Sequence, residues 1–265
     1  MPPSRIVCLT EETTETLYLL GEEARIVGIS GFTVRPARAR REKPKVSAFT
    51  SARIEQICSL TPDLVLGFSD LQADIAADLI RRGVAVHVFN HRDVAGIFEM
   101  IRMLGAMIGC EAKAAVLCAQ LSAGLDDIRE SAATLKVRPR VYFEEWDEPL
   151  IVGSRWVSEL VQLAGGEECF PQYAAQSLAK GRIIADDREV IGAAPDIILG
   201  SWCGKKFRPE MVRARPGWNS IPAVANGQLH EIKSCLILQP GPAALTDGIK
   251  AIHRLILQWS RRIDS

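Results

Sequence analysis

The chain has 265 residues, of which 48% are hydrophobic and 24% are charged. This composition is typical of a folded globular protein and excludes an intrinsically disordered chain. The 32 Lys and Arg residues balance the 32 Asp and Glu residues and are scattered, which argues against electrostatic capture of nucleic acid or an anionic membrane surface.

The start of the chain bears on its compartment. Met1 to Arg5 leads directly into the strand-like residues 6–9, which leaves no room for the charged and apolar regions of a signal peptide. We therefore expect either that export information lies outside this sequence or that the protein stays inside the cell. The seven cysteines are odd in number and form no CxxC pair, so at least one thiol is unpaired, which favours a reducing compartment.

The first hundred residues alternate short β-branched runs with amphipathic stretches, a pattern that predicts parallel strands joined by helices. The predicted strands are residues 5–9, 26–29, 64–67 and 84–89, and the predicted helices are residues 12–20, 55–60 and 73–82. Gly21 and Gly83 suit helix ends. The basic run 35–45 is expected to be a solvated loop rather than a phosphate site.

Residues 95–135 predict an almost continuous helix with a break near Gly109, because apolar residues recur every three or four positions. Such a connector is stiff and limits domain closure to a small rocking motion. The alternation then resumes, and the predicted elements are strands at 141–144 and 197–199 and helices at 157–164 and 244–259.

The predicted fold class is α/β, with two Rossmann-like lobes joined by a long rigid helix and a ligand cleft between the lobes. The expected boundaries are residues 1–110 for the N-terminal lobe, 111–137 for the connecting helix and 138–265 for the C-terminal lobe.

Residues 55–68 are similar to residues 189–202, with one residue of difference in spacing. Each segment predicts a helix that starts at a Glu, a Pro-Asp turn, a buried strand, and then Gly and an aromatic residue. Any α/β protein can repeat this local pattern. The functional interpretation is that each lobe delivers an aromatic side chain, Phe68 or Trp202, to a shared ligand at the carboxyl end of its strand.

No motif predicts catalysis. The sequence contains no GxxxxGK[ST] loop, no GxGxxG after a strand, no GxSxG elbow and no HExxH motif. The four histidines are dispersed, so neither a catalytic triad nor a metal site with regular ligand spacing is predicted. We expect no catalytic residue, no resident metal and no required cofactor, and direct metal ligation by Cys203, His87 or His91 is not favoured.

Several segments together resemble a known family, the helix-bridged (class III) substrate-binding proteins of ABC importers for cobalamin and ferric siderophores. The resemblance covers nearly the whole chain, and the order and spacing of its motifs carry it. They are residues 5–10, residues 15–21, residues 25–30, residues 57–68, Trp156-Val-Ser-Glu-Leu-Val-Gln-Leu-Ala-Gly-Gly, Arg215-Pro-Gly-Trp-Asn-Ser-Ile-Pro, Asn226-Gly-Gln-Leu and Gln239-Pro-Gly-Pro.

The resemblance implies a monomeric solute-binding component that works with an ABC permease and ATPase and captures a corrinoid or a ferric siderophore. Glu55 and Glu189 match the surface glutamates, one per lobe, that dock onto permease arginines in that family. The simpler interpretation of each is a helix N-terminal Glu stabilised by the macrodipole. The family works in the periplasm or at the outer face of the membrane, whereas the missing signal peptide keeps a cytoplasmic location open.

A broad, partly apolar ligand needs aromatic walls and a few directional polar contacts. Core packing is the competing role for every ring, and Trp156, Trp218 and Trp259 are assigned mainly to it. The acidic segment 144–149 is expected after a strand, either lining the cleft or forming a solvated loop, and residues 201–208 combine a ring, a thiol and three cations. The predicted ligand-binding residues are Tyr18, Phe32, Phe49, Phe68, Glu145, Trp146, Trp202, Cys203 and Lys205.

Two other functions remain open from the sequence. The first is a cytoplasmic chelatase or corrinoid-processing enzyme on a related two-lobed fold, in which Glu145 or His91 would be required for turnover. The second is an intracellular corrinoid carrier or sensor that never meets a permease.

Overall fold

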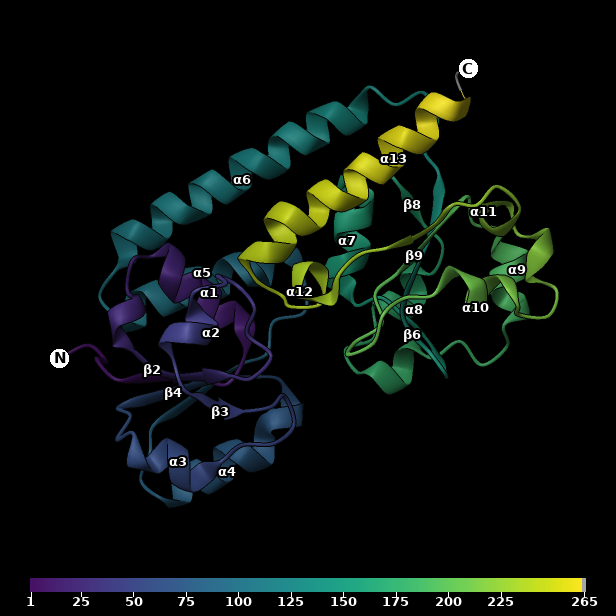
Figure 1. The fold of residues 1–265 in the computed structure, drawn as a ribbon. Coiled ribbons are helices and arrows are strands. Elements are labelled where there is room, and N and C mark those ends of the chain that lie inside the picture. The colour runs from purple at the N-terminus through teal and green to yellow at the C-terminus, as the bar shows by residue number, and fades with distance from the viewer. Residues whose placement is uncertain (264–265) are drawn as a thin grey trace. The chain divides into compact units, whose positions relative to one another are not determined.

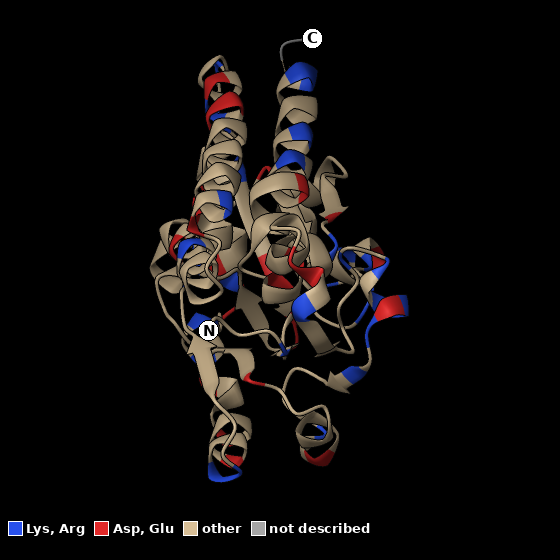
Figure 2. Cartoon of the chain, turned by 90° about the vertical axis from the view of Figure 1, so that its left-hand side faces the viewer, with Lys and Arg blue, Asp and Glu red and all other residues tan. Residues whose placement is uncertain are grey.

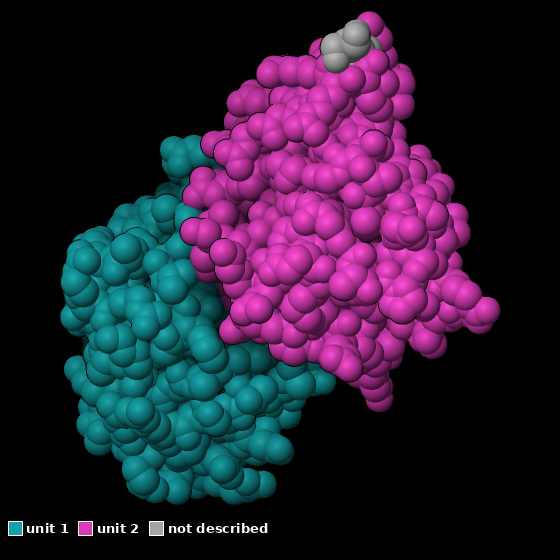
Figure 3. Space-filling model, turned by 45° about the vertical axis from the view of Figure 1, so that its right-hand side comes forward, with its two compact units in different colours: residues 1–91, 95–121 teal, residues 92–94, 122–265 magenta. Residues whose placement is uncertain are grey.

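A computed structural model describes residues 1–263 (Figure 1). The chain forms two compact units (Figure 3). Unit 1 contains residues 1–91 and 95–121, and unit 2 contains residues 92–94 and the residues from 122 onward. The chain therefore passes from one unit to the other both around residues 92–94 and within a single long helix.

Unit 1 is built on a parallel five-stranded sheet with the spatial order β3-β2-β1-β4-β5. Its strands are β1 (Ile6–Cys8), β2 (Ile26–Ser30), β3 (Lys45–Ser47), β4 (Leu64–Phe68) and β5 (Val86–Phe89). Its helices are α1 (Glu11–Leu19), α2 (Ala39–Glu42), α3 (Ile54–Ser59), α4 (Ala73–Arg81), α5 (Val94–Met107) and the first part of α6 (Glu111–Ala133), with 3-10 turns at Glu23–Arg25 and Asp70–Gln72.

The central strands of unit 1 are apolar because helices cover both faces of the sheet. All three residues of β1 and all five of β4 are buried. Helices α3 and α4 lie on one face, and α1 and α5 lie on the other (Figure 1). Ile75 and Leu79 of helix α4 pack in a hydrophobic cluster with Val7 and Ile57. The helix ends before Gly83, whose φ of +79° favours glycine.

Unit 2 is built on a sheet with the spatial order β10-β9-β6-β7, in which β8 also pairs with β6. The β6 to β7 pair is antiparallel and the other pairs are parallel. The strands are β6 (Arg140–Asp147), β7 (Leu150–Val152), β8 (Glu167–Glu168), β9 (Ile197–Gly200) and β10 (Leu229–Glu231). The helices are α7 (Arg155–Leu163), α8 (Pro171–Ala174), α9 (Arg188–Ala193), α10 (Pro209–Arg213), α11 (Pro222–Ala225), α12 (Ser234–Ile237) and α13 (Ile249–Ile263), with 3-10 turns at Ala179–Arg182 and Trp218–Ser220 and a π turn at Ala244–Gly248.

Helix α13 anchors several elements of unit 2 through a buried histidine. One ring nitrogen of His253, Nδ1, lies 2.8 Å from the carbonyl oxygen of Ala164, and the other, Nε2, lies 2.9 Å from Oγ of Ser131 on α6. The histidine thus satisfies both of its polar atoms in the core and connects three helical segments.

The exposed charged residues of α13 are all cationic, whereas the part of α6 in unit 2 carries both positive and negative residues (Figure 2).

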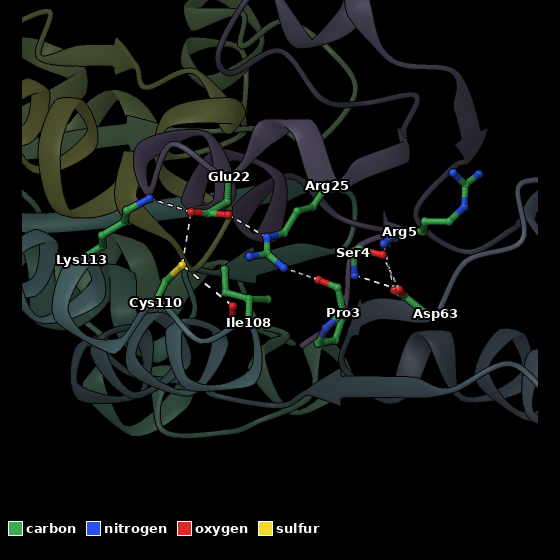
Figure 4. A network of polar contacts seen from close by, with 9 residues as sticks. All are labelled: Pro3, Ser4, Arg5, Glu22, Arg25, Asp63, Ile108, Cys110 and Lys113. Carbon is green, nitrogen blue, oxygen red and sulfur yellow. Dashed lines mark hydrogen bonds and ion pairs between the residues drawn. The ribbon is translucent and has the colours of Figure 1, made fainter. Parts of the chain in front are cut away.

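A polar network fixes the start of α6 onto unit 1 (Figure 4). Glu22 accepts hydrogen bonds from Lys113 Nζ at 2.6 Å, Arg25 Nε at 2.7 Å and Cys110 Sγ at 3.2 Å. These donors, led by Lys113, lower the pKa of Glu22 to about 2. Arg25 also donates to the carbonyl of Pro3 at 2.6 Å, so the N-terminal segment joins the same network.

The predicted elements are confirmed with shifts of at most four residues at their ends, when the π turn at Ala244–Gly248 is counted with α13, and the predicted helical break lies between α5 and α6. Two local predictions are wrong. The basic run 35–45 is not a plain loop, because it contains α2 and the first residue of β3. The acidic segment does not follow a strand, because β6 continues to Asp147.

The two similar segments adopt matching backbones. Thr61 ends the turn after α3 with a φ of +45°, and Ala194 ends α9 with a φ of +44°. Each of these left-handed residues precedes a proline, which cannot continue the helix. Gly67 in β4 and Gly200 in β9 are also equivalent, because neither position has room for a side chain. A Cβ added at Gly67 would lie 2.8 Å from Gln72 Oε1, and a Cβ added at Gly200 would lie 1.9 Å from the Phe207 ring.

Candidate functional site

Polar and aromatic side chains gather at the carboxyl ends of β6 and β9 in unit 2. Glu144 is completely buried there and accepts a paired hydrogen bond from Arg215, at 2.6 and 2.9 Å. Its oxygens also accept from Trp202 Nε1 at 2.9 Å and from the Tyr142 hydroxyl at 3.1 Å. Burial keeps the Tyr142 phenol neutral by raising its pKa well above the ordinary value.

The neighbouring carboxylates are neutralised as well. Arg182, which is 6% exposed, donates to both oxygens of Glu145, at 2.6 and 3.0 Å. The Lys205 ammonium lies 2.5 Å from Asp147 Oδ1. The expectation of a solvated acidic loop is therefore wrong for these residues, because each carboxylate has a cation from elsewhere in unit 2.

Lys205 occupies a position between two indole rings. Its ammonium nitrogen lies 4.3 Å from the ring centroid of Trp146 and 5.0 Å from that of Trp202, distances typical of cation–π contacts. Trp202 is almost fully buried and packs edge-on against Phe207, whereas Trp146 is half-buried. Cys203 and Lys205 lie in an exposed loop, so a solute can reach this end of the sheet.

Four of the eight phenylalanines lie at the carboxyl edge of the unit 1 sheet. Phe68 and Phe89 are the last residues of β4 and β5, and Phe32 and Phe49 follow β2 and β3 by two residues. Phe32 is 54% exposed and Phe49 is half-buried, whereas Phe68 and Phe89 are each 5% exposed. His91 contacts both buried rings edge-on, with centroids 5.2 Å from Phe68 and 6.2 Å from Phe89.

Tyr18, one of the predicted ligand-binding residues, lies within a helix and not at the carboxyl end of a strand. It occupies the last turn of α1, and its hydroxyl donates to Glu42 of α2 at 2.8 Å. The Arg38 guanidinium covers its ring at 4.7 Å from the centroid. Seven residues of helix separate Tyr18 from the start of α1, a distance of about 10 Å. The ring therefore serves the packing of α1 against α2.

The two predicted docking glutamates occupy equivalent, exposed positions at the second residue of α3 and of α9. Glu55 has an ion pair with Arg82 at 2.7 Å, and its side chain is 82% exposed. Both oxygens of Glu189 accept from the Tyr173 hydroxyl, at 2.9 and 3.2 Å. Each carboxylate is reachable from solvent and held by one neighbour.

A resident metal has no ordinary ligand group in the described part of the chain. No group of three His, Cys, Asp or Glu residues within residues 1–263 is close enough to hold a metal ion. The seven thiols, all inside this range, form no disulfide. Burial raises the pKa values of Glu12 and Glu168 to about 8, and the two residues belong to different units. Glu12 accepts a hydrogen bond from the Thr10 hydroxyl, and Glu168 accepts one from the backbone N–H of Phe170.

Sequence reasoning missed two residues of the unit 2 cluster, Arg182 and Arg215. Arg215 lies 71 residues from its partner Glu144 and Arg182 lies 37 residues from Glu145. Because these two ion pairs join distant segments, no local sequence pattern predicts them. Arg215 also stacks on Trp218, at 4.4 Å from the ring centroid, and Trp218 is fully buried, as its assignment to packing predicted. Phe89 was predicted in a strand but not at the site, although its position at the strand's last residue was a usable signal.

Comparison with known proteins relates the chain to substrate-binding proteins. A family model described as periplasmic binding protein matches residues 6–236. An uncharacterised ABC transporter substrate-binding lipoprotein of Bacillus subtilis is 25% identical over 263 residues, which cover 96% of this chain and 80% of the relative. A vitamin B12-binding protein of Vibrio campbellii is 24% identical over 246 residues, which cover 90% of this chain and 84% of the relative.

The fold is also that of a solved structure. The periplasmic heme-binding protein of Roseiflexus sp. RS-1, in its apo form, superposes with a TM-score of 0.79 and 22% identity over 96% of this chain and 99% of the other.

No helix within residues 1–263 combines the length and apolarity that crossing a membrane requires.

Proposed function

Because the chain belongs to the periplasmic binding protein family, we propose that it is the solute-binding component of an ABC importer and that its solute is a metal chelate. Two of the three named proteins are described as binding vitamin B12 or heme, and each of these ligands holds a metal ion in a large tetrapyrrole-type ring. The proposed role is capture and delivery, without chemical change of the solute.

The observation that carries this proposal is the collection of aromatic rings at the carboxyl edge of both sheets. Unit 1 has the exposed Phe32, the half-buried Phe49 and the buried Phe68 and Phe89 at this edge, and unit 2 has the half-buried Trp146 and the buried Trp202. A flat ligand gains most of its affinity from such surfaces, since one ring buries about 150 to 250 Å². Ligands of α/β sheets bind at the carboxyl ends of the strands.

The charges of unit 2 favour a ligand edged with amides, as in a corrinoid, over a polyanionic ferric siderophore. Glu144, Glu145 and Asp147 each have a cation already, so this edge carries little net charge. A neutral amide can donate to a paired carboxylate and accept from Lys205 without breaking the pair. A polyanion would have to compete with Asp147 for the same ammonium, at a cost in electrostatic energy.

Glu55 and Glu189 are proposed to dock onto arginines of a permease that works with an ATPase. Their support is structural equivalence, because both start a short helix that precedes a Pro-Asp turn and a central strand. The proposed location is the outer face of the membrane or the periplasm, since the relatives are described as a lipoprotein and a periplasmic protein. The proposed working form is a monomer.

Titration of the purified chain with cyanocobalamin, dicyanocobinamide, hemin and a ferric hydroxamate tests the proposal. We expect a corrinoid to bind with a submicromolar Kd, and the tryptophan emission to fall as the chelate approaches Trp146. Binding of hemin or the hydroxamate alone would keep the transport role but reject the corrinoid. If none of the four binds more tightly than about 100 µM, the proposed ligand class is wrong.

A further inference from the structure

Unit 2 contains a hollow of about 360 Å³ that shares no residue with the strand-end cluster. Its apolar floor is formed by Val94, Ala132 and Leu163. Small-molecule sites commonly measure about 300 to 1,000 Å³ and combine an apolar lining with a few polar groups. The size therefore suits a small ligand, much smaller than a corrinoid.

The rim of the hollow has two guanidinium groups, those of Arg129 on α6 and Arg138 before β6, and the side-chain amide of Gln162 on α7. Arg129 pairs with Asp126, one helical turn earlier. Arg138 has no ion pair among residues 1–263. Arginine is suited to planar carboxylates because its forked donors match their two oxygens.

The one acidic side chain on the rim, Glu159, is already neutralised. Its Oε1 accepts from Arg155 Nε at 3.0 Å, and its Oε2 accepts from the backbone N–H of Val94 at 2.8 Å. Since Glu159 pairs with Arg155 and Arg129 pairs with Asp126, Arg138 is the rim cation that a ligand carboxylate can pair with, without displacing a partner among residues 1–263.

The hollow is lined by residues from both chain segments that connect the two units. The chain passes between units 1 and 2 at two places, in the segment 92–94 and within α6. Val94 belongs to the first of these, and Arg129 and Ala132 belong to α6. A bound molecule would contact both connections at once.

We propose that this hollow binds a small carboxylate with a short apolar body. The carboxylate would be held by Arg138 with support from Arg129 and Gln162, and the apolar body would cover Val94, Ala132 and Leu163. Because the guanidinium groups are exposed, the affinity is expected to be modest and to weaken as the salt concentration rises. The site is independent of the proposed chelate function.

Titration of the full chain with hexanoate, followed by NMR chemical shifts or calorimetry, tests this inference. We expect saturable binding at one site, and binding at least about tenfold weaker for hexanol, which lacks the charge, and for acetate, which lacks the apolar body. Arg138→Gln should weaken hexanoate binding about tenfold. Arg140→Gln, an exposed arginine two positions away that does not line the hollow, should leave it unchanged.

Equal binding of hexanol and hexanoate by the unmodified protein would overturn the inference, and so would hexanoate binding that is the same in Arg138→Gln. Absence of saturable binding would overturn it as well. The comparison of the two probes needs no variant, so a folding defect cannot obscure it. No chelate is present in this titration, so its failure is distinguishable from a failure of the proposed function.

Discussion

Asp63 and Asp196 perform the same task in the two units. The Asp63 carboxylate accepts from the backbone N–H of Arg5 at 2.9 Å, and the Asp196 carboxylate accepts from the backbone N–H of Arg140 at 2.8 Å. In return the backbone N–H of each aspartate donates to the carbonyl of the same arginine, at 2.9 and 2.8 Å. Each reciprocal pair sets the register of two parallel strands, β4 on β1 and β9 on β6.

We expect Asp63→Ala and Asp196→Ala each to lower the free energy of unfolding by about 1 to 2 kcal/mol, because each leaves a strand-edge N–H without its acceptor. Hydrogen exchange should rise at Arg5 in the first variant and at Arg140 in the second. Asp127→Ala, at an exposed position of α6, is the control and should change neither. Unchanged exchange at both arginines would contradict the assigned role.

The buried pair of Glu144 and Arg215 should be far more sensitive than an exposed pair. Glu144→Gln removes the charge that Arg215 faces, and breaking such a pair costs about 3 to 5 kcal/mol. Asp186→Asn removes one partner of Arg188, whose side chain is 82% exposed, and should change the free energy of unfolding far less, because solvent screens the pair. Urea unfolding of both variants measures the two decreases in the free energy of unfolding. Equal decreases would show that burial does not explain the sensitivity of the Glu144 and Arg215 pair.

Glu22 should make stability depend on pH in the acidic range. Its pKa is lowered from 4.5 to about 2, so the folded state binds fewer protons than the unfolded state between these values. The contribution is present above pH 4.5 and is lost as the pH falls toward 2. Lys113 is more than half exposed and solvent screens the pair, so we expect Glu22→Gln to cost only about 1 kcal/mol at neutral pH.

Urea unfolding of Glu22→Gln and the unmodified protein between pH 7 and pH 2 measures this effect, with the exposed Glu130→Gln as control. The difference between Glu22→Gln and the unmodified protein should narrow with falling pH. A difference that stays constant across the range would contradict the network drawn in Figure 4.

The sequence predicted the regular elements well because long periodic segments and parallel strands have strong local patterns. The 23 residues of α6 and the buried strand β4 are examples. It missed β3, β7, β8 and β10, which have only two or three residues and owe their existence to pairing with a neighbour. The sequence also drew attention to the aromatic residues and to Lys205 at the carboxyl end of the unit 2 sheet, but not to Arg182 and Arg215, since these two cations come from distant segments.

The docking proposal predicts a separation of uptake from binding. In cells that carry the matching permease and ATPase, Glu55→Ala or Glu189→Ala should lower chelate uptake by about tenfold or more, because each removes one charge from the interface. The Kd for the chelate should stay within about twofold, since neither residue lies at a strand's carboxyl end. Glu130→Ala is the matched control. Uptake that survives both substitutions would favour an intracellular carrier.

The central claim is that aromatic side chains at the carboxyl ends of the strands bind the chelate, and calorimetric titration of aromatic variants tests it most directly. Phe32→Ala and Trp146→Ala should each weaken corrinoid binding at least about tenfold. Met103→Ala, at a 48% exposed position of α5, should leave the Kd unchanged. If neither aromatic substitution weakens binding, the account is wrong.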